Sequence, residues 1–268
     1  MHLSYGVHML RCLLRSLSLL YTGGILMLNT ILIGLLAIIS GCTQAVTGFG
    51  AGIVNMVFMP GIIGMNPAAA VSTGAGFPLA LNIARNYLKE CRWKTIPAAL
   101  IPYFVVGWFS VKASTTLDLS SLKAVFGLVL VVFGLYFLFF SEKLKIKAGI
   151  PAAVICGTLG GVINSFFGIG GPPLVVYFLA ATDTKEEYLG TINVFFSVTA
   201  LYLVIIKAMN GIITVDLIPK IISVIIGLLI GSTIGAKIIG RINIVLMKKI
   251  IYFFLIISGV ITTVNALI

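Results

Sequence analysis

Charged side chains are the rarest component of this 268-residue sequence, since only 9% of its residues are Asp, Glu, Lys or Arg. None of these four types occurs from Ser16 to Ala84 or from Ala148 to Thr182. About 20 apolar residues are enough for a helix to cross a bilayer, and soluble domains do not carry such long uncharged stretches. The scarcity of charge therefore excludes a soluble domain and predicts a polytopic membrane protein.

Residues that hold metals or form disulfides are also few, with four cysteines and two histidines in the chain. The cysteines have no Cys-x-x-Cys spacing, and His2 and His8 both lie near the N-terminus, so neither a metal site nor a disulfide framework is expected. The apolar segments contain no Asp pair, no His-Glu-x-x-His motif and no Ser/His arrangement. We therefore expect no catalytic residue, no metal and no cofactor.

Acidic residues are fewer than basic residues, seven against 18, and the net charge is +11. In a membrane protein this excess is expected in loops that face the cytoplasm and anionic lipid. No RNA- or DNA-binding motif interrupts the apolar pattern. The expected surroundings are therefore the bilayer of the cytoplasmic membrane, with no nucleic-acid partner.

Hydrophobic residues make up 60% of the chain, and their grouping predicts an all-α fold of about eight to ten membrane segments. Residues 1–26 are treated as a poorly informative N-terminal extension, with Met27 as an alternative start, and 27–268 as a single transmembrane domain. Whether segments 49–65 and 169–181 cross fully stays open, since the second is short enough for a half-helix or a re-entrant segment. The segments are about 27–46, 49–65, 67–84, 96–111, 122–140, 149–166, 169–181, 189–206, 217–236 and 247–267.

Two glycine-rich elements interrupt these segments, the first at Thr47–Gly52 and the second at Phe167–Pro173. Glycine and proline weaken the interior of a helix. Inside a membrane, such breaks are tolerated where they are buried in protein or line a cavity. Pro172 and Pro173 suit the first turn of a new helix. We therefore predict that the two elements form the functional site, with broken helices that meet near the bilayer midplane.

The two halves of the chain, about 27–140 and 149–268, read as copies of one unit. Aligning the glycine elements pairs Gly48 with Gly168 and Gly50 with Gly170. Further along the chain, other residues of the two halves match in the same order, and the number of residues that separates each matched pair stays nearly constant. Each single match is weak because glycine is common here. Their shared order favours a duplication.

Loop charge indicates that the two copies have opposite orientations. In the first half, the loop 85–94 is more basic than the loop 112–123. The matching loops of the second half, 207–220 and 237–249 in the same order, show the reverse, since 237–249 is the more basic one. Under the positive-inside rule, equivalent loops then face opposite sides of the membrane. This predicts an inverted-topology repeat, the architecture of many secondary transporters; chance variation in short loops is the alternative. The mid-chain connector is predicted to be cytoplasmic from Lys143, Lys145 and Lys147.

The chemistry around the glycine elements favours an anion as the ligand. No charged residue lies within the predicted spans near them, and a cation carrier usually has an intramembrane carboxylate. An anion can be held by backbone N–H groups at helix N-termini with hydroxyl and amide side chains, and packing between helices is the alternative role for each residue. Gln44 and Ser72 add to these polar groups. The predicted substrate-binding residues are Thr47, Gly48, Gly50, Asn55, Thr73, Asn164, Ser165, Gly168, Gly170, Gly171, Thr191 and Asn193.

The sequence resembles the TauE/SafE family of sulfite exporters, or toluene-sulfonate-uptake-type permeases. The resemblance covers the chain from about Met27 and rests on the glycine elements Gly48–Gly50 and Gly168–Leu174. It also rests on the small Ser/Thr segments that follow them, Ala70–Thr73 and Gly190–Thr191. The first element departs from the family pattern at Ala51, where members often carry a third glycine.

This resemblance implies a secondary transporter that moves small sulfur-containing anions, such as sulfite or organosulfonates, across the cytoplasmic membrane, usually outward. The proton gradient or the membrane potential is the expected driving force. A carrier for another small anion or metabolite is one alternative, and a non-transporting membrane assembly protein is another. The exact substrate, the direction, the coupling ion and a possible homo-oligomer stay open.

Overall fold

The computed structural model describes residues 2–116, 119–140 and 147–238, together with parts of 252–266. All regular secondary structure in these described residues is helical. Five of the described helices are long and apolar enough to cross a membrane, which confirms the prediction of an all-α, multi-pass membrane protein. These five spans are Leu26–Thr47, Trp93–Ser114, Ile150–Phe167, Lys185–Met209 and Val215–Lys237.

Proline marks the beginning of several helices, since it stands in the first turn of α3, α5, α7 and α8. Its missing N–H costs nothing there, because the first N–H groups of a helix have no partner within it. Three short 3₁₀ helices cover Leu88–Glu90, Trp93–Thr95 and Val215–Leu217. The α-helices are α1 (His2–Thr47), α2 (Ala51–Phe58), α3 (Pro60–Ile63), α4 (Met65–Asn86), α5 (Ile96–Ser114), α6 (Leu119–Phe140), α7 (Ile150–Phe167), α8 (Gly171–Ala181), α9 (Lys185–Met209) and α10 (Ile218–Ile238).

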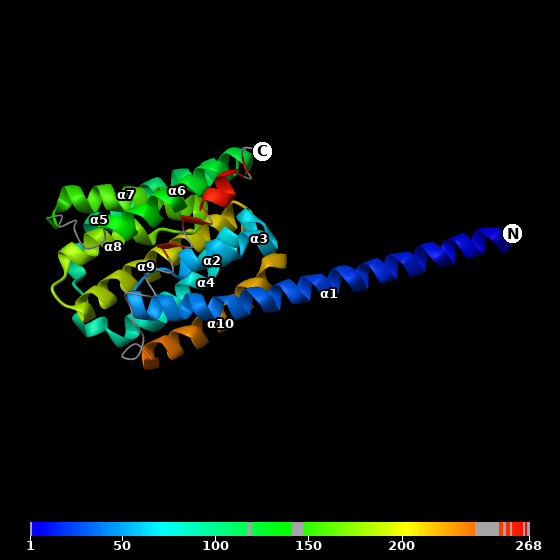
Figure 1. The fold of residues 1–268 in the computed structure, drawn as a ribbon, viewed down its shortest axis with the longest axis horizontal. Helices are drawn as coiled ribbons and strands as arrows, with labels where there is room; N and C mark the ends of the chain where they lie inside the picture. The colour runs from blue at the N-terminus through cyan, green and yellow to red at the C-terminus, as the bar shows by residue number, and fades with distance from the viewer. Residues whose placement is uncertain are drawn as a thin grey trace.

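Helix α1 is continuous from His2 to Thr47, so the N-terminal extension leads without a break into the first apolar segment. Figure 1 shows that its N-terminal half projects beyond the other helices, while its C-terminal half lies along α10. The two backbones come close at Gly41 and Gly231, where a Cβ atom would collide with a backbone carbonyl of the other helix. Small residues at this contact allow the close helix packing that membrane proteins favour.

The segment predicted at 49–65 is not one helix. It divides into α2, of eight residues, and α3, of four, before Gly64 ends α3 with φ +84°. Helix α8, which follows the second glycine element, has 11 residues. At 1.5 Å per residue, α2 and α8 are both too short to cross a bilayer alone. Each glycine element is therefore followed by a short helix.

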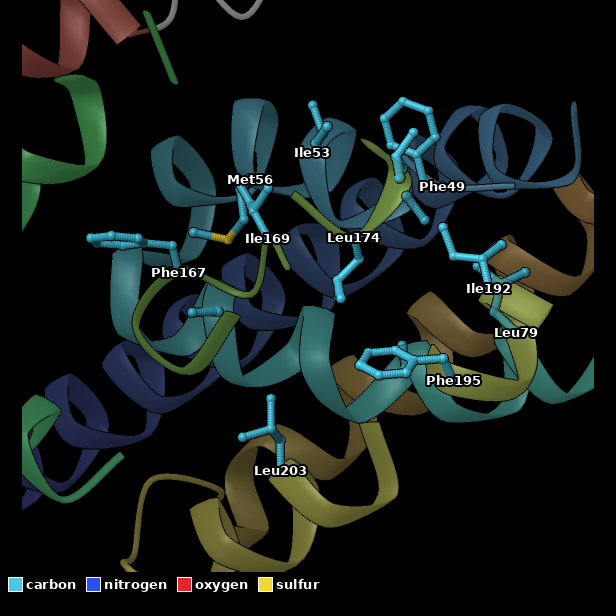
Figure 2. Close-up of a cluster of buried hydrophobic side chains, with 14 of the residues drawn as sticks. Phe49, Ile53, Met56, Leu79, Phe167, Ile169, Leu174, Ile192, Phe195 and Leu203 are labelled. Carbon is cyan, nitrogen blue, oxygen red and sulfur yellow. The ribbon is translucent and has the colours of Figure 1, made fainter. Parts of the chain in front are cut away.

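The helices pack as three pairs, α1 with α10, α5 with α7, and α4 with α9. Helix α2 lies against α1 and α4, whereas α8 lies against α7 and α9. A cluster of buried side chains joins these central helices, and Figure 2 shows Phe49 and Ile169 from the glycine elements in it together with Phe195 and Leu203 from α9. The core thus surrounds the two glycine elements.

Parts of the loop-charge prediction lie outside the described residues. These are residues 117–118 of the loop 112–123, Lys143 and Lys145 of the mid-chain connector, and residues 239–249 of the last basic loop. The final predicted segment, 247–267, is described only in part.

Candidate functional site

The first glycine element is a sharp break between α1 and α2. Gly48 and Gly50 have φ values of +80° and +107°, a region that is open to glycine and strained for other residues. The hydroxyl of Thr47 turns back to donate to the carbonyl oxygen of Thr43 at 2.8 Å. Helix α2 then begins at Ala51.

The side chain of Gln44 holds this break in place. Its Oε1 accepts a hydrogen bond from the N–H of Ala51 at 3.0 Å, and its Nε2 donates to the carbonyl of Gly48 at 3.3 Å. The same Nε2 donates to Oδ1 of Asn193 in α9 at 3.2 Å. Asn193 in turn donates to the carbonyl of Gly48 at 3.4 Å. Both amides are buried, so they fix the end of α1, the start of α2 and α9 relative to one another.

The second glycine element is a similar break between α7 and α8. Gly168 ends α7 with φ +67°, and its N–H donates to the carbonyl of Asn164 at 2.9 Å. Gly170 precedes α8, whose first residue is Gly171. The Asn164 side chain donates through Nδ2 to the hydroxyl of Tyr103 in α5 at 2.6 Å. Asn164 thus ties this element to a neighbouring helix.

The two elements touch each other although they are far apart in the sequence. A Cβ atom on Gly52 would collide with the carbonyl oxygen of Gly168. On the other side, Gly171 lies against Phe49, whose ring Cδ2 would be 3.4 Å from a Cβ there. Contact this close requires a residue without a side chain at position 52.

A cavity of about 80 Å³ lies where the two elements meet α4 and α9. Its size suits a small ion of a few non-hydrogen atoms, because one water molecule needs at least about 10–15 Å³ of such space. Further polar lining comes from Gln44, Ser72 and Thr199, and Phe196 adds an aromatic ring. The predicted site residues that line the cavity are Gly50, Asn55, Thr73, Asn164, Gly168, Gly170 and Gly171.

The other predicted site residues do not line this cavity. Thr47, Gly48 and Asn193 belong to the hydrogen-bonded frame of the first element. Ser165 donates to the carbonyl of Gly161 at 2.7 Å within α7. Thr191, near the start of α9, accepts a hydrogen bond from the N–H of Arg92 at 2.9 Å. Arg92 follows the C-terminal end of α4 in the chain.

Asn55 presents an unpartnered polar atom at the cavity. Its side chain is buried, and its Nδ2 donates to the hydroxyl of Ser72 at 3.3 Å. Its Oδ1 has no hydrogen-bond partner among the described residues. Buried polar atoms are nearly always paired with protein or water. Because Oδ1 is an acceptor, it indicates a hydrogen-bond donor, such as a water molecule, beside Asn55.

One charged residue near the cavity was not expected from the sequence. The predicted loop 207–220 begins at Lys207, but α9 continues to Met209 and the Lys207 side chain is buried. Its Nζ donates to Oγ1 of Thr73 at 3.0 Å. The expectation of a site without charge nearby was therefore wrong. One signal in the sequence could have shown this: Thr199, Leu203 and Lys207 are spaced four residues apart, so in a continuous helix they lie on the same face.

Tyr103 was also missed, because it looks like one of many aromatic residues in apolar segments. The structure buries it completely, with its hydroxyl on Asn164. Its ring packs edge-on against Phe195 of α9, with ring centroids 5.5 Å apart. Nothing in the local sequence distinguishes this tyrosine from an aromatic residue that faces lipid.

Comparison with known proteins agrees with the resemblance seen in the sequence. The family described as "Sulfite exporter TauE/SafE" matches residues 33–262. A protein of Cupriavidus necator named as a probable sulfite/organosulfonate exporter TauE is 27% identical over 188 residues, which are 67% of this chain and 73% of that protein. No solved structure matches the chain. Because the family match includes both glycine elements and most of the chain, the protein belongs to the TauE/SafE family of sulfite exporters.

Proposed function

We propose that the chain is a secondary transporter that binds sulfite, or an organosulfonate of similar size, between its two glycine elements and exports it. The observation that carries this proposal is the cavity where both elements meet, whose lining among the described residues includes amides and hydroxyls and no carboxylate. The family description and the name of the Cupriavidus necator relative support a sulfur-containing anion as the substrate. Members of the family are transporters and not enzymes.

The chemistry of the cavity suits a small anion. Asn55 and Asn164, whose amide groups each carry two N–H donors, lie on its walls, and the N-termini of α2 and α8 begin beside it. Backbone N–H groups and the helix dipole favour negative charge at such ends. The small volume favours sulfite over a bulky aromatic sulfonate. Other small anions remain competing substrates, which the experiment below separates.

An inverted-topology repeat is part of this proposal, and the helix pairing supports it. The first helix of one half, α1, packs on α10 of the other half, and α7 packs on α5 in the same exchanged way. Helices α2 and α8, which follow the glycine elements, each lie against the helix that precedes them. Rocking of one half against the other would then expose the cavity to each side of the cytoplasmic membrane in turn. The cavity is formed within one chain, so one chain is the transport unit even in a homo-oligomer.

The test is efflux from liposomes that contain the purified full-length chain. Sulfite, sulfoacetate, thiosulfate and a carboxylate are compared under an imposed pH gradient, with protein-free liposomes as the control. We expect sulfite to leave fastest and the carboxylate to stay inside. Transport of the carboxylate without transport of any sulfur anion would contradict the proposed substrate class. Absence of any solute movement would favour an assembly role.

A further inference from the structure

Lys207 is a buried basic residue that the transport mechanism above does not use. It lies in the last turns of α9, its side chain is only 2% exposed, and the hydrogen bond described for its ammonium group is with Thr73. The ion pairs of the described residues join Arg92 to Asp183 and Glu187, near the opposite end of α9. No carboxylate of the described residues pairs with Lys207. A buried ammonium without a counter-charge is costly in a membrane.

The position of Lys207 connects this charge to the cavity. Helical side chains lean toward the N-terminus of their helix, so the Lys207 stem runs back along α9 in the direction of Thr199. Thr73, which accepts from its Nζ, lines the cavity itself. The Thr73 hydroxyl donates in turn to the carbonyl of Ala69 at 2.7 Å, which leaves its oxygen facing the lysine. One side chain therefore separates the ammonium group from the cavity.

We propose that Lys207 is the residue that makes the cavity selective for anions, because the transported anion is its missing counter-charge. The inference rests on the proposed function, and it adds a charged residue to a site built otherwise from neutral groups. Thr73 acts as the positioning residue that holds the ammonium group beside the cavity. The positive charge of Lys207 stabilises an anion on the other side of the Thr73 side chain, in the cavity. The same charge does not stabilise a cation or a neutral solute.

The test compares Lys207→Gln, Lys207→Arg and the wild-type chain in sulfite-loaded liposomes. We expect Lys207→Gln to raise the KM for sulfite about tenfold or more, since a charge pair at low dielectric is worth at least that factor. Lys207→Arg keeps the charge and is expected to restore most of the affinity. The matched control is Lys220→Gln, because Lys220 is also nearly buried but its Nζ bonds to the carbonyl of Asp216 in its own helix region.

The charge of the substrate separates this role from a structural one. Sulfite, which is partly divalent at neutral pH, and monovalent methanesulfonate are compared at that pH in the same liposomes. Loss of one fixed positive charge weakens binding of the dianion more than binding of the monoanion. A KM for sulfite within about twofold of the wild-type value in Lys207→Gln, or equal losses for both anions, overturns the proposal.

Two further measurements keep the outcome decisive. If Lys207→Gln does not insert, Lys207→Met replaces it, because that variant buries no unpaired polar group. Sulfite-dependent stabilisation against thermal unfolding reports binding without transport. Stabilisation of the wild-type chain but not of Lys207→Met upholds the role of Lys207 even where efflux is absent and the proposed export fails. Equal stabilisation of both proteins overturns the role of Lys207 while leaving export intact.

Discussion

In the proposed repeat the two glycine elements occupy matching places, yet the structure fixes them in different ways. The first has two glycines with positive φ and is held by the buried amides of Gln44 and Asn193. The second has one such glycine, Gly168, and is held by Asn164 on Tyr103. The difference shows that a repeated pattern of glycines can be stabilised by unrelated neighbours.

The first turns of α2 and α8 also differ in the groups that they offer. Ala51, Gly52 and Ile53 at the start of α2 each carry a backbone N–H, and Gln44 binds the first of them. Helix α8 begins with Gly171 and two prolines, which have no N–H. The first element is therefore richer in hydrogen-bond donors, whereas the second is stiffer. An anion in the cavity is expected to receive more backbone hydrogen bonds from α2 than from α8.

The largest effect is expected where the two elements touch. Gly52→Ala places a methyl group against the carbonyl oxygen of Gly168, which forces the elements apart. Overpacking of this kind costs about 1–3 kcal/mol or more when backbone is the obstacle. We expect sulfite efflux to fall to the background of protein-free liposomes. Gly61→Ala is the control, since nothing lies within 4 Å of its added Cβ; wild-type efflux in Gly52→Ala would show that the contact is dispensable.

The second-largest effect is expected at the amide side chains that hold the two glycine elements. Gln44→Ala removes contacts with Ala51, Gly48 and Asn193, and it leaves buried polar groups unpaired at about 1–3 kcal/mol each. Asn164→Ala removes the bond to Tyr103. We expect Gln44→Ala to lower the thermal unfolding temperature more than Asn164→Ala does. Equal shifts in the two unfolding curves would contradict the difference between the elements.

A smaller effect is expected at Tyr103, whose hydroxyl orients Asn164 from outside the cavity. Tyr103→Phe removes the acceptor and keeps the buried ring, so Asn164 loses one hydrogen bond worth about 1 kcal/mol. We expect the KM for sulfite to rise about fivefold with little change in the maximal rate. A larger rise in KM for Tyr103→Phe than for Asn164→Ala would mean that Asn164 does not act on the substrate.

Membrane class and helical fold could be predicted from the sequence, because long uncharged runs reflect a strong physical constraint. The glycines of both elements mark positions that need a positive φ or close backbone contact, as Gly50 and Gly168 show. These constraints act on the local chain, so one sequence is enough to read them.

The rest of the site depends on contacts between distant segments, which local pattern does not contain. Lys207 looked like a loop residue because charge usually ends a membrane segment, and only the packing of α9 on α4 reveals that it is buried. The division of 49–65 at Pro60 was hidden by uniform hydrophobicity. The partner of Asn164 could not be read from the sequence either, since Tyr103 lies 61 residues earlier in the chain, in another helix.

The smallest effect on transport is expected at Thr191, which lies in a Ser/Thr segment that follows the second glycine element, as the segment of Thr73 follows the first. The structure places Thr73 on the cavity wall, but it places the Thr191 hydroxyl against the N–H of Arg92. Thr191→Val should therefore lower stability by about 1 kcal/mol and leave the KM for sulfite unchanged, whereas Thr73→Val should raise it. Parallel efflux and thermal unfolding measurements on the two variants check this contrast. Equal increases in KM would mean that the two halves contribute matching threonines to the substrate, and that the asymmetry between the glycine elements is confined to the backbone.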